Sequence, residues 1–313
     1  MNALAIQVQG LRKRYAEKQV LDHVHIEVPR GSIFALLGEN GAGKTTTVRI
    51  LSTLIQADGG KATIDGYDVS RDAAQIRNII SLTGQYAAVD ELLTGEENLL
   101  LMGSLLHLDR RIVKQRTVEL LEQFDLSSAA RRSVKTYSGG MRRKLDIAVS
   151  LLASPSVIFL DEPTTGLDPR SRATMWELIR NLAKDGVTIF LTTQYLEEAD
   201  QLADKIAVLS EGRIVAEGTS EELKAIVGQE MLELRFQTAE DCTKAGLLLQ
   251  VQHDSETLLR LPAGENTDRL RMTLNTLHEH SITPAAVEYR KPTLDDVFMT
   301  MTGEVGKGVR HYA

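Results

Sequence analysis

The residues best suited to chemistry in this sequence are a lysine and a threonine that follow a glycine-rich segment. The spacing G-x-x-x-x-G-K-T comes directly after the apolar segment 32–37, and its members are Gly38, Glu39, Asn40, Gly41, Ala42, Gly43, Lys44, Thr45 and Thr46. In such a loop backbone N–H groups turn toward phosphate oxygens, and the dipole of the following helix adds to the attraction. We expect Lys44 to reach the β- and γ-phosphates of a nucleotide and the Thr45 hydroxyl to bind Mg²⁺. The alternative is a chance glycine-rich turn, which a preceding strand and a following helix disfavour.

Two carboxylates form the second candidate group. Asp161 and Glu162 directly follow four apolar residues, 157–160, that read as a buried strand. Ligands of open α/β sheets bind where such strands end. Asp161 therefore suits a second Mg²⁺ contact, through water, and Glu162 suits a base or polariser for an attacking water. Taken alone, the same pair could equally be two solvated carboxylates that open a loop.

A third group is Ser138, Gly139 and Gly140, which precede an apolar-periodic helix. A serine and two glycines at this place could be a helix cap and a turn. They could equally form an anion site at the helix N-terminus. The residues by themselves leave both interpretations open.

The elements that must position these groups alternate along the first 220 residues. Short apolar runs at 32–37, 157–160, 187–191 and 206–209 predict buried strands, and the segments 44–54, 96–108, 111–124, 142–152 and 170–184 predict helices. This alternation predicts an α/β domain around a largely parallel sheet, with antiparallel strands in 5–27 that turn near 15–18. From residue 219 a helix start, alternating strands and two further helical segments predict a small α+β domain. We expect domains at 1–218, with a helical subdomain at about 86–150, and at 219–313.

Composition limits the classes of function. The chain has 313 residues, 42% hydrophobic and 25% charged, and its net charge of -7 argues against a nucleic-acid binder. A single cysteine, Cys242, excludes an intrachain disulfide and fits a reducing compartment. No window approaches 18 uninterrupted apolar residues, so the sequence predicts no membrane span. If the protein acts at a membrane, another chain must supply the span.

The order of these motifs resembles one family. The phosphate loop, SGG before a helix, VIFLDEP at 157–163 and GLD at 166–168 together resemble the nucleotide-binding subunit of an ATP-binding-cassette (ABC) transporter over residues 1 to about 220. The resemblance implies ATP and Mg²⁺ as cofactors and a head-to-tail dimer of two copies. Each ATP would lie between one copy's phosphate loop and the other copy's SGG, so that Ser138, Gly139 and Gly140 touch the γ-phosphate in trans. Asp168 would help the two sites communicate.

The same resemblance assigns three more positions. Tyr15 falls where the family stacks an aromatic ring on adenine, although a tyrosine on a turn is the simpler interpretation of that residue alone. Gln85 falls on the glutamine loop that senses Mg²⁺ and the membrane partner. Gln194 stands where the family usually has a histidine that contacts the γ-phosphate and orients the catalytic glutamate. A glutamine can donate and accept hydrogen bonds but cannot become cationic near neutral pH. Gln194 either positions water or Glu162, with slow hydrolysis as the result, or merely ends a strand.

Three longer segments narrow the resemblance to a branch. The segments 137–155, 192–204 and 292–303 together look like the daunorubicin-resistance branch of ABC exporters. This implies an ATPase subunit that powers export through a separate integral membrane permease, at the cytoplasmic face of a bacterial membrane. The segment 87–108 could dock such a permease or be an ordinary helical subdomain. The last segment could be a dimer contact or a closing amphipathic helix. The alternatives to transport are a soluble ABC-type ATPase and an ATP sensor.

Overall fold

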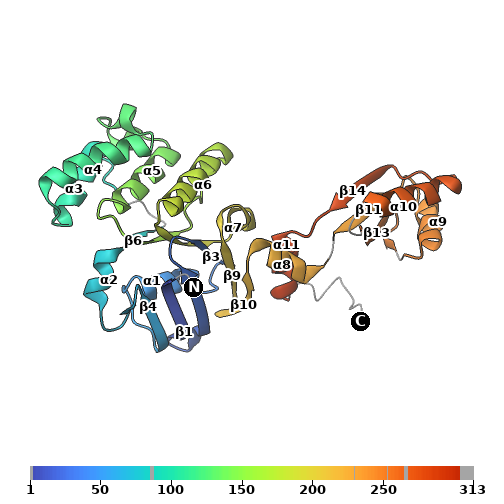
Figure 1. Ribbon diagram of the computed structural model, residues 1–313, viewed down its shortest axis with the longest axis horizontal. Helices are drawn as coiled ribbons and strands as arrows, with labels where there is room; N and C mark the ends of the chain where they lie inside the picture. Colours follow the sequence, from blue (N-terminus) through green and yellow to red (C-terminus); the bar gives the residue numbers. More distant parts are fainter. Residues whose placement is uncertain (1–2, 85–87, 229, 252, 264–266, 304–313) are drawn as a thin grey trace. The chain divides into compact units, whose positions relative to one another are not determined.

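The structure, a computed structural model, describes residues 3–84, 88–228, 230–251, 253–263 and 267–303. The chain divides into two compact units, Met1–Ser220 and Glu221–Ala313. The first unit has two sheets and the second has one, and each unit has its own hydrophobic core (Figure 1).

The first unit begins with a four-stranded antiparallel sheet in the order β2-β1-β4-β5. Its strands are β1 (Leu4–Tyr15), β2 (Lys18–Pro29), β4 (Gly59–Ile64) and β5 (Tyr67–Asp68). Tyr15 pairs with Lys18, which confirms the predicted turn. Buried and exposed residues alternate along much of β2, because one face of this sheet packs on the core and the other faces water.

A six-stranded sheet in the order β10-β9-β3-β8-β7-β6 forms the centre of the first unit. Its strands are β3 (Ile33–Leu37), β6 (Ile80–Thr83), β7 (Val157–Asp161), β8 (Thr188–Thr193), β9 (Lys205–Ser210) and β10 (Arg213–Gly218). Every pairing except that of β10 with β9 is parallel, as predicted. Every residue of β3, β7 and β8 is buried, since both faces of a parallel sheet are covered.

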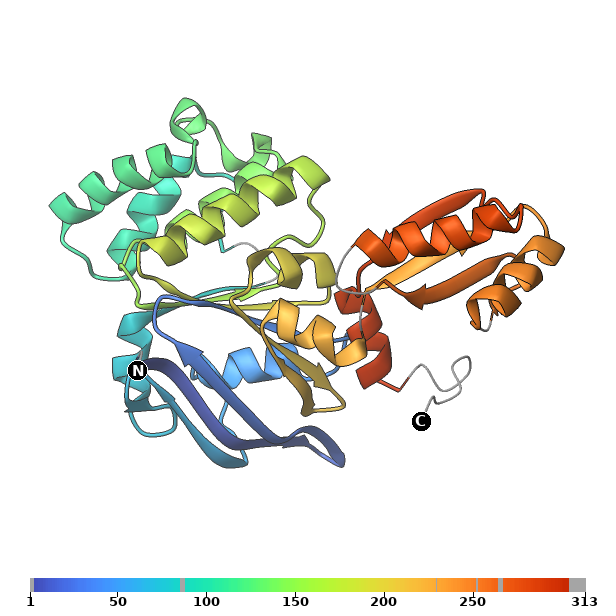
Figure 2. The same cartoon turned by 45° about the vertical axis from the view of Figure 1, so that its right-hand side comes forward.

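Helices cover both faces of this central sheet. Figure 1 shows α1 between the central and the antiparallel sheet, while α5 and α6 lie on the opposite face. Figure 2 shows the same layers from a second direction. The helices here are α1 (Lys44–Leu51), α2 (Ala73–Ile79), α5 (Gly139–Ser150), α6 (Pro169–Lys184) and α7 (Leu196–Leu202). Val48 and Leu51 of α1 share one apolar cluster with Val8 and Phe34, so a single core joins the two sheets.

Between β6 and β7 the chain is helical. Its elements are α3 (Gly95–Leu105), α4 (Arg110–Gln123), the short 3₁₀ turns η1 (Ser127–Ala129) and η2 (Val134–Thr136), and then α5. Thr94 and Glu97 form a reciprocal capping box at the start of α3, and Asp109 caps α4. These caps set where the two helices begin.

The second unit is an antiparallel sheet with helices. It contains α8 (Ser220–Val227, whose first residue ends the first unit), β11 (Met231–Arg235), α9 (Ala239–Leu249), β12 (His253–Ser255), β13 (Leu258–Pro262), α10 (Thr267–Glu279), β14 (Ala286–Arg290) and α11 (Leu294–Met301). The strand order is β12-β13-β11-β14. Leu232 and Leu234 of β11 pack with Ala245 of α9 and Leu277 of α10. In the part of the chain that the structure describes, no helix has both the length and the apolar character needed to cross a bilayer.

Candidate functional site

The phosphate loop, Gln194 and the pair Asp161–Glu162 lie at the ends of three neighbouring parallel strands. In the central sheet β8 lies between β3 and β7, and Leu37 of β3 is level with Thr193 of β8. Thr192 of β8 is in turn level with Asp161 of β7. The phosphate loop, Gln194 and Glu162 each follow one of these strands, so they leave the sheet at the same edge.

Two backbone hydrogen bonds continue the pairing beyond the strands. The Gly38 N–H donates to Thr193 O at 3.2 Å, and the Glu162 N–H donates to Thr192 O at 3.1 Å. The first residue of the phosphate loop and the carboxylate segment are therefore both tied to β8.

The phosphate loop needs its glycines for conformation and for space. Gly41 and Gly43 have φ of 85° and 115°, values that side-chain-bearing residues rarely adopt. A Cβ atom at Gly43 would lie 2.7 Å from Leu21 Cδ2 and 2.9 Å from Val20 O, both on β2. The antiparallel sheet therefore packs directly against the loop, and only glycine fits there.

Lys44 is the first residue of α1 and lies across the phosphate loop. Its Nζ donates to Gly38 O at 2.7 Å and to Glu39 O at 3.0 Å, and only 5% of the residue is exposed. Burial lowers the pKa of Lys44, while the nearby charges of Glu162 and Asp161 work in the opposite direction. The ammonium group thus lies among loop carbonyls and carboxylates, where a phosphate would also lie.

Thr45 and Asp161 meet from opposite sides of the site. The Thr45 hydroxyl donates to the Asp161 carboxylate at 3.2 and 3.4 Å, and Asp161 is 5% exposed. A hydroxyl and a carboxylate are hard oxygen donors of the kind that Mg²⁺ prefers. The donor set therefore fits this ion.

Thr192 is a site residue that the sequence analysis missed. Its hydroxyl donates to Asp161 Oδ1 at 2.5 Å and accepts the Glu162 N–H at 3.2 Å. It is fully buried, and it lies next to both carboxylates only through strand pairing. The one sequence signal is that polar threonines end an otherwise apolar strand.

Glu162 has an unusual backbone conformation. Its φ is +50°, which for a residue other than glycine costs on the order of 1–3 kcal/mol. Glu162 Oε1 lies 3.8 Å from Lys44 Nζ, and Thr165 donates to Oε2 at 3.2 Å. The strained backbone therefore turns the carboxylate toward the lysine of the phosphate loop.

The remaining predicted residues differ in how the structure places them. Gln194 is half-buried and directly follows β8, beside the phosphate loop. Tyr15 lies at the tip of the β1–β2 hairpin, is 45% exposed, and has the Lys13 ammonium 5.5 Å from its ring centroid. Gln85 lies outside the described residues.

Ser138 and Asp168 are both exposed N-caps. Ser138 accepts the Met141 N–H at 3.2 Å at the start of α5, and the glycines Gly139 and Gly140 form its first turn. Asp168 accepts the Arg170 and Ser171 N–H groups at the start of α6, and its pKa is lowered chiefly by the Ser171 hydroxyl. The structure therefore contains the helix cap, one of the two interpretations of Ser138, Gly139 and Gly140. The N-terminus of α5 is also exposed, which leaves room for the other, an anion site.

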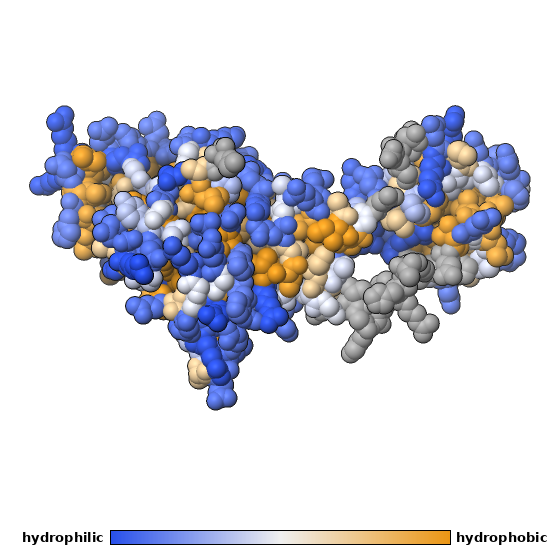
Figure 3. Space-filling model, turned by 60° about the horizontal axis from the view of Figure 1, so that its bottom comes forward, coloured by the Kyte–Doolittle hydropathy of each residue, from blue (hydrophilic) through white to orange (hydrophobic). Residues whose placement is uncertain are grey.

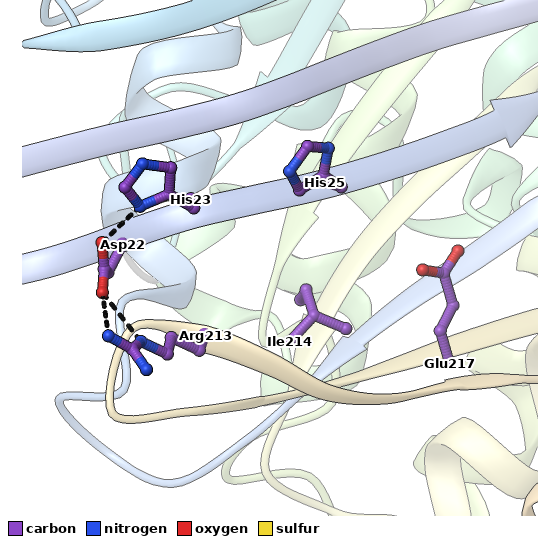
Figure 4. A pocket seen from close by; sticks show the side chains of 6 residues that line it. All are labelled: Asp22, His23, His25, Arg213, Ile214 and Glu217. Atoms are coloured by element: carbon purple, nitrogen blue, oxygen red, sulfur yellow. Dashed lines mark hydrogen bonds and ion pairs between the residues drawn. The ribbon is translucent and has the colours of Figure 1, made fainter.

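A hollow at the surface beside β2 and β10 contains none of the predicted site residues (Figure 4). Its lining residues are Asp22, His23, His25, Arg213, Ile214 and Glu217. His23 and Arg213 both contact Asp22, and these bonds lower its pKa. Within the described ranges no group of three or more His, Cys, Asp or Glu residues is placed to hold a metal ion. This hollow is an exposed ion-pair cluster on the surface.

Comparison with known proteins identifies relatives of this chain in sequence and in structure. The family model described as ABC transporter matches residues 21–165. A daunorubicin resistance ATP-binding protein of Streptomyces coeruleorubidus is 48% identical over 96% of both chains. A doxorubicin resistance ATP-binding protein of Mycobacterium tuberculosis is 45% identical over 98% of this chain and 96% of its own. The solved ADP conformation of an ATP-binding cassette of an ABC transporter has a TM-score of 0.65 at 26% identity, over 71% of this chain and 93% of that one.

Proposed function

Because this chain belongs to the ABC transporter family, as an ATP-hydrolysing subunit, we propose that it powers export of an amphipathic, drug-like molecule through a separate membrane permease. The drug-like substrate is inferred from the relatives named for daunorubicin and doxorubicin resistance.

One observation carries the proposed chemistry. The phosphate loop, Gln194 and the pair Asp161–Glu162 leave the central sheet at one edge, on adjacent strands. We infer that ATP binds along this edge, with its phosphates on the N–H groups of the loop and of the α1 N-terminus. The adenine would stack on the exposed ring of Tyr15.

Each residue then has a role in water attack on the γ-phosphate. Lys44 exchanges its loop carbonyls for phosphate oxygens and balances their charge. Thr45 and Asp161 hold Mg²⁺, which supplies charge neutralisation at the phosphates when bound. Glu162 accepts or polarises the proton of the attacking water. Gln194, which follows the neighbouring strand, positions that water or the Glu162 carboxylate through neutral hydrogen bonds.

The proposed partners are a second copy of the chain and a permease. The exposed caps at Ser138 and Asp168 are available to a second copy, whose phosphate loop would face SGG. Export further requires a membrane-spanning partner, with this chain bound at the cytoplasmic face of the membrane. Apolar surface lies at the end of the first unit that carries α3 (left in Figure 3). The exposed leucines on and near α3 are Leu92, Leu101, Leu105 and Leu106. They support docking of a permease helix there.

The test is Mg²⁺-dependent ATP hydrolysis by the full chain, alone and with its permease. Replacing Glu162 by Gln should lower kcat by about 10²- to 10⁴-fold, the usual contribution of a positioned base, while ATP binding persists. Gln194→His should change the rate and Gln194→Ala should lower it. Unchanged turnover in Gln194→Ala would mean that this glutamine only ends a strand.

Two outcomes would favour the alternatives. Turnover that is independent of any permease, with no permease-like chain co-purifying, would favour a soluble ATPase. ATP binding without turnover in every preparation would favour a sensor. Turnover retained in Glu162→Gln would remove the proposed mechanism.

A further inference from the structure

A buried arginine on α5 donates to the carbonyl oxygens of the residues on both sides of Glu162. Arg143 Nε donates to Pro163 O at 3.0 Å, and its Nη2 donates to Asp161 O at 3.3 Å. The side chain is 10% exposed. The guanidinium group therefore spans the one residue of the segment whose φ is +50°.

The same guanidinium group has two further partners. Its Nη1 donates to Gly84 O at 2.7 Å, directly after β6, and to Asp146 Oδ2 at 3.2 Å. Asp146 is 3% exposed, and its other oxygen accepts the Ala88 N–H at 2.8 Å. Three carbonyls and a carboxylate thus surround one planar group whose five N–H donors have a fixed geometry.

The buried ion pair of Arg143 and Asp146 would be a costly way to gain stability alone. Taking two charges out of water carries a large desolvation penalty, and apolar residues of similar volume often replace buried ion pairs with no loss of stability. Burial lowers the pKa of Arg143 and raises that of Asp146, as that penalty requires. What apolar residues could not supply is the set of hydrogen bonds to the carbonyls around Glu162.

We propose that Arg143, held by Asp146, is a positioning residue for ATP hydrolysis that fixes the backbone of Glu162. It holds the carbonyls of the two neighbouring residues, Asp161 and Pro163, and so opposes rotation of the backbone at Glu162 toward a more ordinary φ. The carboxylate then stays beside Lys44. This inference rests on the proposed role of Glu162 as base or polariser.

A double substitution separates this role from simple stability. Arg143→Met with Asp146→Leu removes both charges together, so neither is left buried without a partner. We expect the full chain to fold and to bind ATP as the wild type does. Its kcat should fall by about 10- to 100-fold, the scale of a misplaced catalytic group. Arg143→Lys keeps the positive charge but loses the planar set of N–H donors that reaches both carbonyls. The kcat of this variant should also fall, with its ATP affinity unchanged.

Arg180→Met is the matched control. Arg180 also donates to a backbone carbonyl, Gln201 O at 2.9 Å, but on α6 away from the carboxylate segment. The kcat of the Arg180→Met variant should equal that of the wild type. The proposal is overturned if the double variant folds and hydrolyses ATP at the wild-type rate. If the double variant fails to fold, a folded Arg143→Lys chain with full kcat overturns it.

Amide hydrogen exchange gives a readout that does not depend on turnover. In the nucleotide-free chain, the amides of residues 161, 162, 164 and 165 should exchange faster in the double variant than in wild type or Arg180→Met. Unchanged exchange there would overturn the proposal whatever the kinetics. Faster exchange together with full turnover in Glu162→Gln would mean that Arg143 does fix this backbone and that the role given to Glu162 is wrong.

Discussion

Asp161 keeps a carboxylate in a buried position because two hydroxyl groups donate to it. Thr192 donates from the neighbouring strand, and Thr45 donates from the first turn of α1. A buried carboxylate without donors would lose a large part of its hydration without replacement. At the scale of the residue, the site is therefore preorganised by its hydroxyl groups as much as by its charges.

We expect Thr192→Val to destabilise the first unit. Valine keeps the shape of threonine but removes one of the two hydroxyl donors to Asp161, and losing a hydrogen bond to a buried charged group costs about 1.5–3 kcal/mol. Urea unfolding followed by the fluorescence of Trp176, the single tryptophan, measures this cost, because Trp176 is buried on α6 of the first unit. Thr192→Ser, which retains the hydroxyl, should recover most of the loss. A Thr192→Val chain as stable as wild type would contradict this account of Asp161.

At the scale of the element, the sheet of the second unit has its own charge cluster. Glu233 in the middle of β11 is 5% exposed and lies level with Arg260 of β13, which donates to Glu233 Oε1 at 2.7 Å. Arg290 of β14 approaches the same oxygen at 3.5 Å. Opposite charges across strands stabilise the pairing of those strands. This cluster therefore links β13, β11 and β14 on the face opposite Leu232 and Leu234.

The Glu233 cluster predicts a pH dependence. Burial raises the pKa of Glu233, but the hydrogen bond and charge of Arg260 and the charge of Arg290 outweigh it and lower the pKa below its ordinary 4.5. A carboxyl whose pKa is lowered in the folded state stabilises the fold above its unfolded pKa, and that contribution is lost as the pH falls through the folded value.

The second unit should therefore lose stability as the pH falls below about 4.5. Glu233→Gln should cost about 1–3 kcal/mol at neutral pH, because a charge-assisted hydrogen bond is lost, and should flatten this acid dependence. Urea titrations across this pH range, with trapping of the Cys242 thiol by a disulfide reagent that reacts in acid as the readout, measure both effects. Glu279→Gln, at the exposed end of α10, is the control. An equally steep acid dependence in Glu233→Gln would assign it to other groups.

At the scale of the whole molecule, the single tryptophan and the single cysteine report on different units. Trp176 lies in the first unit, and Cys242 is fully buried on α9 of the second. Burial raises the pKa of the Cys242 thiol, so little thiolate forms at neutral pH and its labelling reports unfolding of that unit.

We expect Mg·ATP to stabilise the first unit and leave the second unchanged. All proposed nucleotide ligands lie in Met1–Ser220, and binding stabilises the folded form to which the ligand binds, by about 2.7 kcal/mol at a concentration of 100 Kd. Urea unfolding with both readouts, with and without Mg·ATP, measures this difference. Lys44→Ala, which removes a phosphate ligand, should reduce the shift in the Trp176 transition. Protection of Cys242 by Mg·ATP would show that the two units are coupled.

The sequence by itself determined the local features. The strands β3, β7 and β8 were predictable because buried parallel strands are continuous apolar runs. The phosphate loop was predictable because its glycines, lysine and threonine act within nine consecutive residues. Less regular elements were missed: β4 contains two glycines and a lysine, β6 has only four residues, and α9 starts after a threonine cap in a polar stretch.

Only the tertiary structure decided which distant residues meet. Thr192 contacts Asp161 through the register of β8 on β7, which no local pattern encodes. Arg143 reads as a surface charge beside Arg142 and Lys144 until α5 packs against the central sheet and buries it. The backbone turn at Glu162 is likewise held by partners far away in the sequence. Hydrogen bonds and burial depend on which atoms lie close in space, so these contacts are fixed only once the sheet and its helices have assembled.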